Sequence, residues 1–389
     1  MGVVKFLHTA DIHVGFYPTR FGDEVRQRLS EARMQVLETI LRTAEKERVD
    51  LITIAGDLFD DAFVERSWAE RVFDLLHEKA PCCVYIVAGN HDPLLPGSVW
   101  ARPPWVGGSK ELHVFREPDE VNLPQGLRLL GVPLFYKRSP EHPLRTTRLR
   151  TESHPTILLT HGSLQGVGVR IDQNDNPLPA DILAEAFCFA ALGHWHAQSS
   201  FLNDRVWYPG TPEPMRFPKA NIATGWHTYG TPYSVEGRED SVLIVEMDKS
   251  GSAFVRSVET ATLTWEARVE HISPGTDWGK LIARYANRPK QNRAVLYLCL
   301  KGAISLAARQ NLETLRSIVH GRYAVGILDD STLQQELSDE DIRELAGEGI
   351  VRRLYERLRG ERIQGVSDEV LREAITLLAQ LVREAQNEA

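Results

Sequence analysis

The sequence lacks the cysteine patterns of metal-bound or disulfide-stabilised scaffolds. Its four cysteines are Cys82, Cys83, Cys188 and Cys299; two are adjacent, and none has zinc-motif spacing. A disulfide framework and a cysteine-ligated metal are therefore both unexpected. No apolar run approaches the roughly 20 residues of a membrane span, and the first residues do not resemble a secretory signal. We therefore expect a cytoplasmic protein without a membrane partner.

Net positive charge is also missing. The 389-residue chain has a formal net charge of -8, which argues against a generally basic nucleic-acid-binding surface and leaves room only for a local basic groove. The nucleotide-binding pattern GxxxxGK[ST] is absent too. Hydrophobic residues make up 42% and charged residues 25%, as in ordinary globular proteins. A chain of this length is expected to form more than one domain.

Short apolar segments that end in polar residues recur through the first two hundred residues. They span residues 3–7, 51–55, 84–87, 156–159 and 189–192. Continuous apolar runs of this length are typical of strands that are buried on both faces. Helical patterns at 25–47 and 64–79 separate the first three strands. This alternation predicts a layered α/β domain.

The remainder of the chain predicts a smaller α/β unit and a helical tail. A strand at 241–247 is expected to close the first sheet. The second unit has predicted helices at 278–285 and 307–320 and predicted strands at 294–300 and 323–328. From residue 338 onward only helical signals remain. We therefore divide the chain into domains at residues 1–250, 251–330 and 331–389.

Side chains that bind metal ions gather just after the five predicted strands. They are Asp11, His13, Asp57, Asn90, His161, His194 and His196. Ligands collect at the carboxyl ends of strands in open α/β sheets, so we expect these residues to meet at one edge. Oxygen and imidazole donors without thiolates suit manganese, iron or zinc. Seven donors exceed the needs of one ion, and two ions about 3.5–4 Å apart could share Asp57 as a bridge.

The order of these motifs resembles the calcineurin-like metallophosphoesterase superfamily. More narrowly, the chain is similar to SbcD-type DNA-repair exonucleases, the nuclease subunits of SbcCD complexes. The segments that carry the resemblance are HTADIHVG at 8–15, AGDLFD at 55–60, VAGNHD at 87–92, THG at 160–162, ALGHWH at 191–196 and YPGTPE at 208–213. It implies a layered α/β sandwich with a small α/β capping domain and a helical C-terminal tail that binds a partner.

The resemblance also implies a role for each residue of these motifs. The first metal ion would take Asp11, His13, Asp57 and His196, and the second would take Asp57, Asn90, His161 and His194. His91 would donate a proton to the leaving oxygen, and Asp92 would orient His91. The cofactors would be two divalent ions, with Mn²⁺ in first place and Mg²⁺, Fe²⁺ or Zn²⁺ as alternatives.

The sequence departs from some relatives directly after the GD motif. Where those relatives have a histidine, this chain has Asp60 and Asp61, so the role of that histidine has no counterpart here. The pattern GNHD, together with the absence of DRG after GD, argues against a calcineurin-type protein phosphatase. His8 lies close to the first ligands, and we interpret it as a core or supporting residue rather than a ligand.

The function implied by the resemblance is metal-dependent hydrolysis of DNA. The chain would act as an exonuclease or endonuclease in double-strand-break repair, associated with the nucleoid. It would work as a homodimer with an SbcC-type coiled-coil ABC ATPase. Two alternatives stay open. One is a two-metal phosphodiesterase for nucleotides or other small phosphate esters, and the other is a non-catalytic DNA-binding scaffold.

Three further features have both a functional and a structural interpretation. Arg145, Arg148 and Arg150 could contact DNA phosphates or belong to a solvated loop. Trp100 and Trp105 could face DNA or a second subunit, or could simply pack locally. The apolar stripe at 370–382 could dock onto the ATPase or pack against its own domain.

Overall fold

The structure is a computed structural model and describes residues 2–18, 21–107, 109, 111–149, 155–217, 237–305, 308–336 and 350–360, with 370, 374, 377 and 378. It divides into two compact units, Met1–Arg216 with Thr228–Leu263, and Phe217–His227 with Thr264–Ala389. The boundaries at 250 and 330 stay predictions; the first unit continues to Leu263. No helix among the described residues is long and apolar enough to cross a membrane.

The first sheet of the first unit contains three of the five strands predicted to carry ligands. Its members are β1 (Val3–Thr9), β2 (Leu51–Ala55), β3 (Cys83–Val87), β4 (Leu112–Val114), β13 (Ser241–Asp248) and β14 (Ala253–Glu259). Their order is β14-β13-β1-β2-β3-β4, with β1 to β4 parallel. β13 pairs antiparallel with β1, so the strand predicted at 241–247 joins this sheet.

The second sheet contains the other two predicted strands. Its members are β5 (Asp119–Asn122), β6 (Arg128–Val132), β7 (Thr156–His161), β10 (Phe189–Gly193), β11 (Ser199–Phe201) and β12 (Val206–Tyr208), in the order β11-β12-β10-β7-β6-β5. A short separate pair joins β8 (Ser163–Leu164) to β9 (Pro177–Leu178). The expectation that all five strands share one sheet edge was therefore wrong. A strand buried on both faces has the same pattern in either sheet, so the sequence could not separate them.

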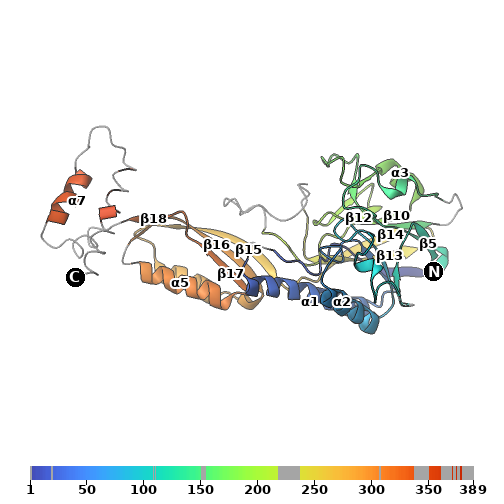
Figure 1. The fold of residues 1–389 in the computed structure, drawn as a ribbon, viewed down its shortest axis with the longest axis horizontal. Coiled ribbons are helices and arrows are strands. Elements are labelled where there is room, and N and C mark those ends of the chain that lie inside the picture. Colours follow the sequence, from blue (N-terminus) through green and yellow to red (C-terminus); the bar gives the residue numbers. More distant parts are fainter. Residues whose placement is uncertain are drawn as a thin grey trace. The chain divides into compact units, whose positions relative to one another are not determined.

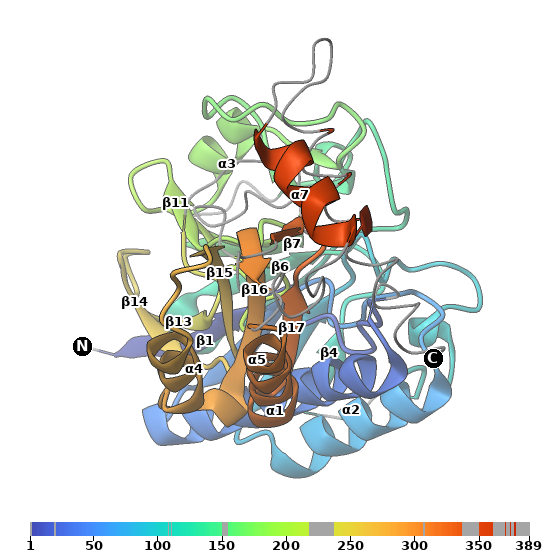
Figure 2. The ribbon, with the colours of Figure 1, turned by 90° about the vertical axis from the view of Figure 1, so that its left-hand side faces the viewer.

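Four layers build the first unit, which confirms the layered α/β architecture that was predicted. Helices α1 (Asp23–Glu47) and α2 (Arg66–Lys79) cover the outer face of the first sheet, where Leu37 and Val72 share an apolar cluster with Ile54. Figure 2 shows these two helices side by side. The inner faces of the two sheets pack together, with the rings of Phe6 and Phe189 5.8 Å apart. Helix α3 (Ala180–Ala186) lies on the outer face of the second sheet.

Strand alternation determines which side chains lie between the two sheets. In β7, Ile157 and Leu159 belong to the inner core, so His161 comes next on the same face. In β1, His8 is fully buried; its Nδ1 lies 3.1 Å from Thr53 Oγ1 and its Nε2 lies 3.2 Å from the Leu192 carbonyl oxygen of β10. His8 is therefore a polar link between the sheets, as its interpretation as a core residue predicted.

Trp100 and Trp105 pack locally and do not face solvent. Both side chains are buried, and their rings lie 5.2 Å apart. The indole N–H of Trp105 donates to the Ala69 carbonyl oxygen at 3.1 Å, and that of Trp100 donates to the carbonyl oxygen of Asp92. The DNA-facing or dimer-facing interpretation of these tryptophans was therefore wrong. Trp100 instead supports the loop that carries the GNHD motif.

The second unit is a small parallel sheet covered by two helices. Its elements are β15 (Thr264–Ile272), α4 (Trp278–Ala286), β16 (Ala294–Ser305), α5 (Arg309–Arg322), β17 (Val325–Asp329), β18 (Leu333–Glu336) and α7 (Ile350–Gly360) (Figure 1). β16 pairs with β15, β17 and β18, all in parallel. Leu281 of α4 and Leu315 of α5 pack in one cluster with Leu298 of β16.

Little of the predicted tail lies within the described residues. β18 falls inside the segment 331–389, so the sheet continues to Glu336, within the segment that was assigned to the helical tail. Helix α7 is the one continuous tail helix that the described residues contain. Of the apolar stripe predicted at 370–382, only residues 370, 374, 377 and 378 are described, and Val370 and Leu377 among them are exposed. The docking role of this stripe stays a prediction.

Candidate metal centre

The ligand-bearing turns hold their backbones in an uncommon conformation. Asp11, His13 and Asp57 have φ angles of 54°, 53° and 52°, in the left-handed region. This region costs a residue other than glycine roughly 1–2 kcal/mol. Such strained residues persist where the surrounding structure enforces them and concentrate at functional sites. The turns after β1 and β2 therefore maintain a costly geometry that brings their side chains together.

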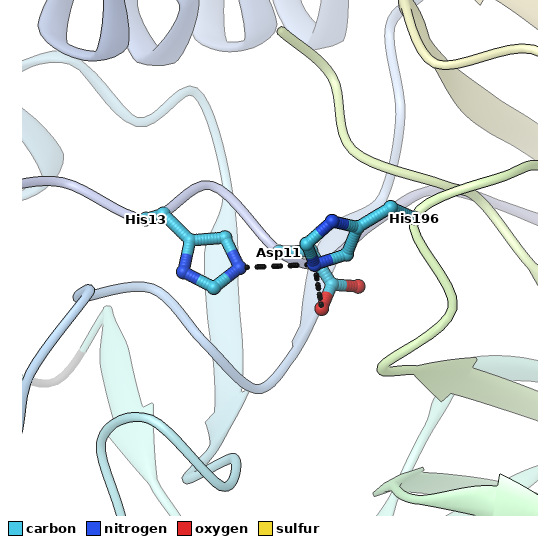
Figure 3. Close-up of side chains that lie close together, drawn as sticks. All are labelled: Asp11, His13 and His196. Atoms are coloured by element: carbon cyan, nitrogen blue, oxygen red, sulfur yellow. Dashed lines mark hydrogen bonds and ion pairs between the residues drawn. The ribbon is translucent and has the colours of Figure 1, made fainter. Parts of the chain in front are cut away.

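One group of donor atoms comes from Asp11, His13 and His196. The Nε2 atoms of His13 and His196 lie 3.3 Å apart, and His196 Nε2 lies 3.8 Å from Asp11 Oδ1. Figure 3 shows the two rings turned toward each other beside the Asp11 carboxylate. Ligand atoms about 2.1 Å from a common ion are expected roughly 3.0–3.5 Å from one another. The two imidazoles match this spacing and the Asp11 oxygen lies slightly beyond it. All three donor atoms lie within 4.8 Å of one another, so these residues, which come from both sheets, are close enough to converge on one cation.

A second group of donor atoms surrounds Asn90. Its Oδ1 lies 2.7 Å from His161 Nε2 and 2.8 Å from His194 Nδ1. The rings of His161 and His194 are 5.1 Å apart and steeply inclined to each other. The loop after β3 supplies the amide oxygen, whereas His161 ends β7 and His194 follows β10 of the second sheet. This group is spaced to hold another cation.

Asp57 lies between the two groups. Its Oδ2 is 3.8 Å from His13 Nε2 and 3.4 Å from His161 Nε2. Donor atoms of Asp11, Asp57 and His161 also lie within 4.8 Å of one another. A single carboxylate oxygen at these distances is suited to a position shared by two ions. The structure thus brings all seven predicted metal ligands together around Asp57, and the assignment of each to a particular ion stays a prediction.

Two glycines of the motifs allow this close approach. A Cβ at Gly89 would collide with the carboxylate and backbone nitrogen of Asp57, and one at Gly193 would collide with the Ala55 carbonyl oxygen. Residues with side chains at either position would push the turns apart. The glycines of GNHD and GHWH are therefore explained by the contact between the β2 turn and its neighbours.

Burial keeps three of the ligand imidazoles neutral and makes a cation favourable. It lowers the pKa of His161 to about 4 and lowers the pKa values of His13 and His196 as well. Neutral rings have the lone pair that a metal ligand needs. Burial, followed by the charge of Asp57, raises the pKa of Asp11 well above its ordinary value. A bound cation would offset this cost of burying carboxylates close together.

The chemistry of the donor atoms fits divalent metal ions. The group combines carboxylate oxygens, one amide oxygen and imidazole nitrogens, which are ligands for manganese, iron or zinc. Burial acts to raise the pKa of Asp57, but at the acid pH where this carboxyl titrates the rings of His161, His91 and His13 are protonated, and together they lower its pKa below the ordinary value. Asp57 is therefore ionised and available to bind cations. The identity of the ions stays a prediction.

His91 is oriented by a different residue from the one predicted. The Asp92 carboxylate accepts hydrogen bonds from the backbone N–H groups of Asp57, Phe59 and Gly89, and so holds the turns together. His91 Nδ1 instead lies 2.9 Å from the Asp60 carbonyl oxygen. The backbone donors occupy Asp92, so the orienting role that was predicted for it belongs to Asp60.

Asp60 also supports the first group of donors. Its carboxylate oxygen Oδ1 lies 3.0 Å from His13 Nδ1, which directs His13 Nε2 toward Asp11 and His196. Burial acts to lower the pKa of His91, but the charges of Asp57 and Asp60 together raise it above its ordinary value. A protonated His91 beside the ligands is suited to donate a proton. In the sequence, Asp60 stood out only as a departure from relatives.

Two more supporting residues were not found from the sequence. Asp175 Oδ2 lies 2.7 Å from His194 Nε2, and His142 Nε2 lies 3.0 Å from the His161 carbonyl oxygen. Asp175 belongs to the loop before β9, and His142 to the loop after β6. Neither residue follows one of the five predicted strands, so no motif or periodic signal marked them.

The predicted arginine cluster lies partly within the described residues. Arg145 and Arg148 are exposed to solvent, and Arg150 lies outside the described residues. Arg145 ends a short 3₁₀ turn, Pro143–Arg145. Exposure is compatible with either a phosphate contact or a solvated loop. DNA binding by these arginines therefore stays a prediction.

Comparison with known families identifies the first unit. The family model for the calcineurin-like phosphoesterases matches residues 4–198, which include all the metal-site residues described above. The chain belongs to the calcineurin-like phosphoesterase family. Membership confirms the superfamily prediction, the predicted fold class and the expectation of divalent metal ions. The narrower similarity to SbcD-type exonucleases stays a prediction.

Individual relatives share only a modest sequence identity with this calcineurin-like phosphoesterase, and over only part of its length. The uncharacterized metallophosphoesterase YhaO of Bacillus subtilis is 28% identical over 227 residues, covering 54% of this chain and 53% of YhaO. The DNA double-strand break repair protein Mre11 of Aeropyrum pernix is 28% identical over 264 residues, covering 62% of this chain and 59% of Mre11. The chain thus spans less than two thirds of either relative. Among solved structures, TT1561 of Thermus thermophilus aligns with a TM-score of 0.39 and 11% identity, covering 66% of this chain and 99% of TT1561.

Proposed function

We propose that this calcineurin-like phosphoesterase is a DNA nuclease that cleaves phosphodiester bonds with two divalent ions during double-strand-break repair. The observation that carries the two-ion chemistry is the place of Asp57 Oδ2, 3.8 Å from His13 Nε2 and 3.4 Å from His161 Nε2. The similarity to a relative named for DNA double-strand break repair supports DNA as the substrate. Cleavage as an exonuclease or an endonuclease, and association with the nucleoid, are parts of this proposal.

Different residues of the chain have different roles in the proposed hydrolysis. Two divalent ions, when bound, would supply Lewis-acid chemistry by polarising the phosphoryl oxygens and lowering the pKa of a water molecule. Asp57 and the six other donors fix the positions of these charges. The Asp60 carbonyl oxygen accepts from His91 Nδ1–H, which leaves His91 Nε2 to donate a proton to the leaving oxygen. The side chain of His91 is 35% exposed, so a substrate can reach it.

The proposal extends to the metal and to protein partners. Manganese is placed first among the candidate ions because the donors mix carboxylate, amide and imidazole groups. An SbcC-type coiled-coil ABC ATPase is the proposed partner of a homodimer of this chain. The resemblance of the motifs to SbcD-type nucleases supports that partner. The absence of a GxxxxGK[ST] motif from the sequence is consistent with an ATPase activity supplied by another chain.

Parallel assays on DNA and on a small diester test this function. End-labelled double-stranded DNA and a chromogenic small diester are each incubated with the full-length protein and Mn²⁺. We expect cleavage of the DNA at a much higher kcat/KM than that of the small diester. Asp57→Asn should abolish both activities, because it weakens a ligand that both ions share, while its circular dichroism spectrum stays that of the wild type.

Other outcomes would point to a different function. Efficient cleavage of the diester with intact DNA would indicate an enzyme for nucleotides or other small phosphate esters. DNA binding without hydrolysis of either substrate would indicate a scaffold. Either result contradicts the proposed nuclease activity.

A further inference from the structure

His194 enters the metal centre through a different ring nitrogen from the other imidazoles. His13, His161 and His196 direct Nε2 toward the shared donors, whereas His194 directs Nδ1 toward Asn90 Oδ1 at 2.8 Å. The Nε2 atom of His194 lies 2.7 Å from Asp175 Oδ2 on the opposite side of the ring. The orientation of this ring is therefore set by a carboxylate outside the motifs.

Asp175 is itself held in place by buried neighbours. Ser163 Oγ donates to the same Asp175 Oδ2 at 2.7 Å, and Trp195 Nε1 donates to Ser163 Oγ at 3.2 Å. The backbone beside Asp175 is also fixed, because Asn176 N donates to the Ser139 carbonyl oxygen at 3.1 Å. Ser163 and Trp195 are almost fully buried. A carboxylate supported in this way holds a defined position instead of sampling solvent.

This contact has a direct consequence for the tautomer of His194. A neutral imidazole has one N–H, and the Asp175 carboxylate can only accept a hydrogen bond. The proton of neutral His194 is therefore held on Nε2, and the lone pair of Nδ1 faces Asn90 and His161. Carboxylates that contact the far nitrogen of a metal-binding histidine fix its orientation and strengthen it as a ligand.

We propose that Asp175 is a positioning residue for the second metal ion, acting through His194. The proposal rests on the two-ion part of the proposed function and does not depend on the identity of the substrate. The other group of donors has a separate support, since Asp60 Oδ1 lies 3.0 Å from His13 Nδ1. Loss of Asp175 therefore weakens one ion selectively and leaves the other in place.

Calorimetric titration of Mn²⁺ into metal-free full-length protein tests this proposal. Wild type should bind two ions. Asp175→Ala should bind the first ion with unchanged affinity and the second about 10–100-fold more weakly. Asp175→Asn should lose much less affinity for the second ion, because its amide oxygen still accepts a hydrogen bond from His194 Nε2–H. Asp204→Ala is the matched control, since Asp204 also accepts from a serine hydroxyl, that of Ser200, but lies in an exposed turn.

Electron paramagnetic resonance gives a second readout that a merely structural role would not change. At two equivalents of Mn²⁺, wild type and Asp204→Ala should show the spectrum of a coupled ion pair, and Asp175→Ala that of a single ion. If Asp175→Ala does not fold, Ser163→Ala tests the same role, because this substitution removes the hydroxyl that holds the Asp175 carboxylate. The expected result for Ser163→Ala is again selective weakening of the second ion.

Two results would overturn the role of Asp175. One is a second ion bound as tightly by Asp175→Ala as by wild type. The other is equal weakening of both ions, without rescue by Asp175→Asn. A wild-type protein that binds a single ion would contradict the proposed two-ion function itself, so the two failures are distinguishable.

Discussion

At the residue scale, contacts to the far ring nitrogen determine how three of the four metal-site histidines present their rings. Asp60 holds His13, the Ala55 carbonyl oxygen lies 2.7 Å from His161 Nδ1, and Asp175 holds His194. The motifs predicted the histidines because each follows a strand. They could not predict the supporting acceptors, since these come from a strand end, a turn and a loop whose positions relative to the histidines depend on the complete fold.

The first prediction concerns His91, the proposed proton donor. His91→Ala should bind two Mn²⁺ ions as wild type does but lose about 10²–10⁴-fold in kcat, the usual contribution of a general acid. The loss should shrink for substrates with good leaving groups, which need no proton. Steady-state kinetics on a series of aryl phosphodiesters, together with metal titration, measures both effects.

A histidine outside the centre provides the control for this prediction. His77 is an exposed residue of α2, and His77→Ala should change neither kcat nor metal binding. Loss of a metal ion from His91→Ala would show that His91 is a ligand. An equal loss of kcat across all leaving groups would also contradict its role as a proton donor.

At the element scale, the sequence predicted the bounds of the strands more accurately than the pairing of the strands into sheets. β2 was predicted at its observed bounds, and β13 and β10 within one residue of theirs, because short apolar runs are a local signal. The assignment of β7 and β10 to a second sheet depends on pairing between distant segments, which no local pattern records. The same limit explains why Asp175, in a loop without periodicity, was not predicted.

The contact of His8 between the sheets predicts a pH dependence of stability. Burial lowers the pKa of His8 from 6.5 to about 4. The unfolded chain therefore takes up this proton below pH 6.5, while the folded chain does so only near pH 4. The stability due to neutral His8 is complete above pH 6.5 and falls as the pH drops toward 4, by up to about 1.4 kcal/mol per pH unit.

Urea unfolding of the metal-free protein at several pH values between 7 and 4 measures this dependence. His8→Gln should unfold with a shallower pH dependence than wild type, because one of the groups that titrate only in the unfolded chain is gone. His77→Ala should keep the wild-type slope. An unchanged slope in His8→Gln would show that His8 is not held neutral between the sheets.

At the scale of the whole molecule, the proposal separates cleavage from partner binding. The metal-site residues all belong to the first unit, whereas the tail belongs to the second. Deleting residues 367–389 should therefore leave Mn²⁺-dependent cleavage of short DNA within about twofold of wild type, because no metal ligand is removed. It should abolish co-purification with the SbcC-type ATPase and any stimulation by ATP.

Two results of the tail deletion would contradict the predicted partner-binding role of the tail. One is full-strength binding of the ATPase by the shortened chain. The other is a cooperative loss of the first unit on deletion, seen as an altered thermal unfolding transition, which would make the tail part of the core. The Asp57→Asn variant at full length is the opposite control, since it should bind the ATPase but cleave nothing.

The central claim is that one carboxylate, Asp57, is shared by two metal ions. The most direct measurement is an anomalous difference map from crystals of the full-length protein soaked in Mn²⁺. The account predicts two peaks, one beside Asp11, His13 and His196, and one beside Asn90, His161 and His194, with the Asp57 carboxylate in contact with both. A single peak at saturating Mn²⁺, or two peaks of which only one touches Asp57, would contradict it.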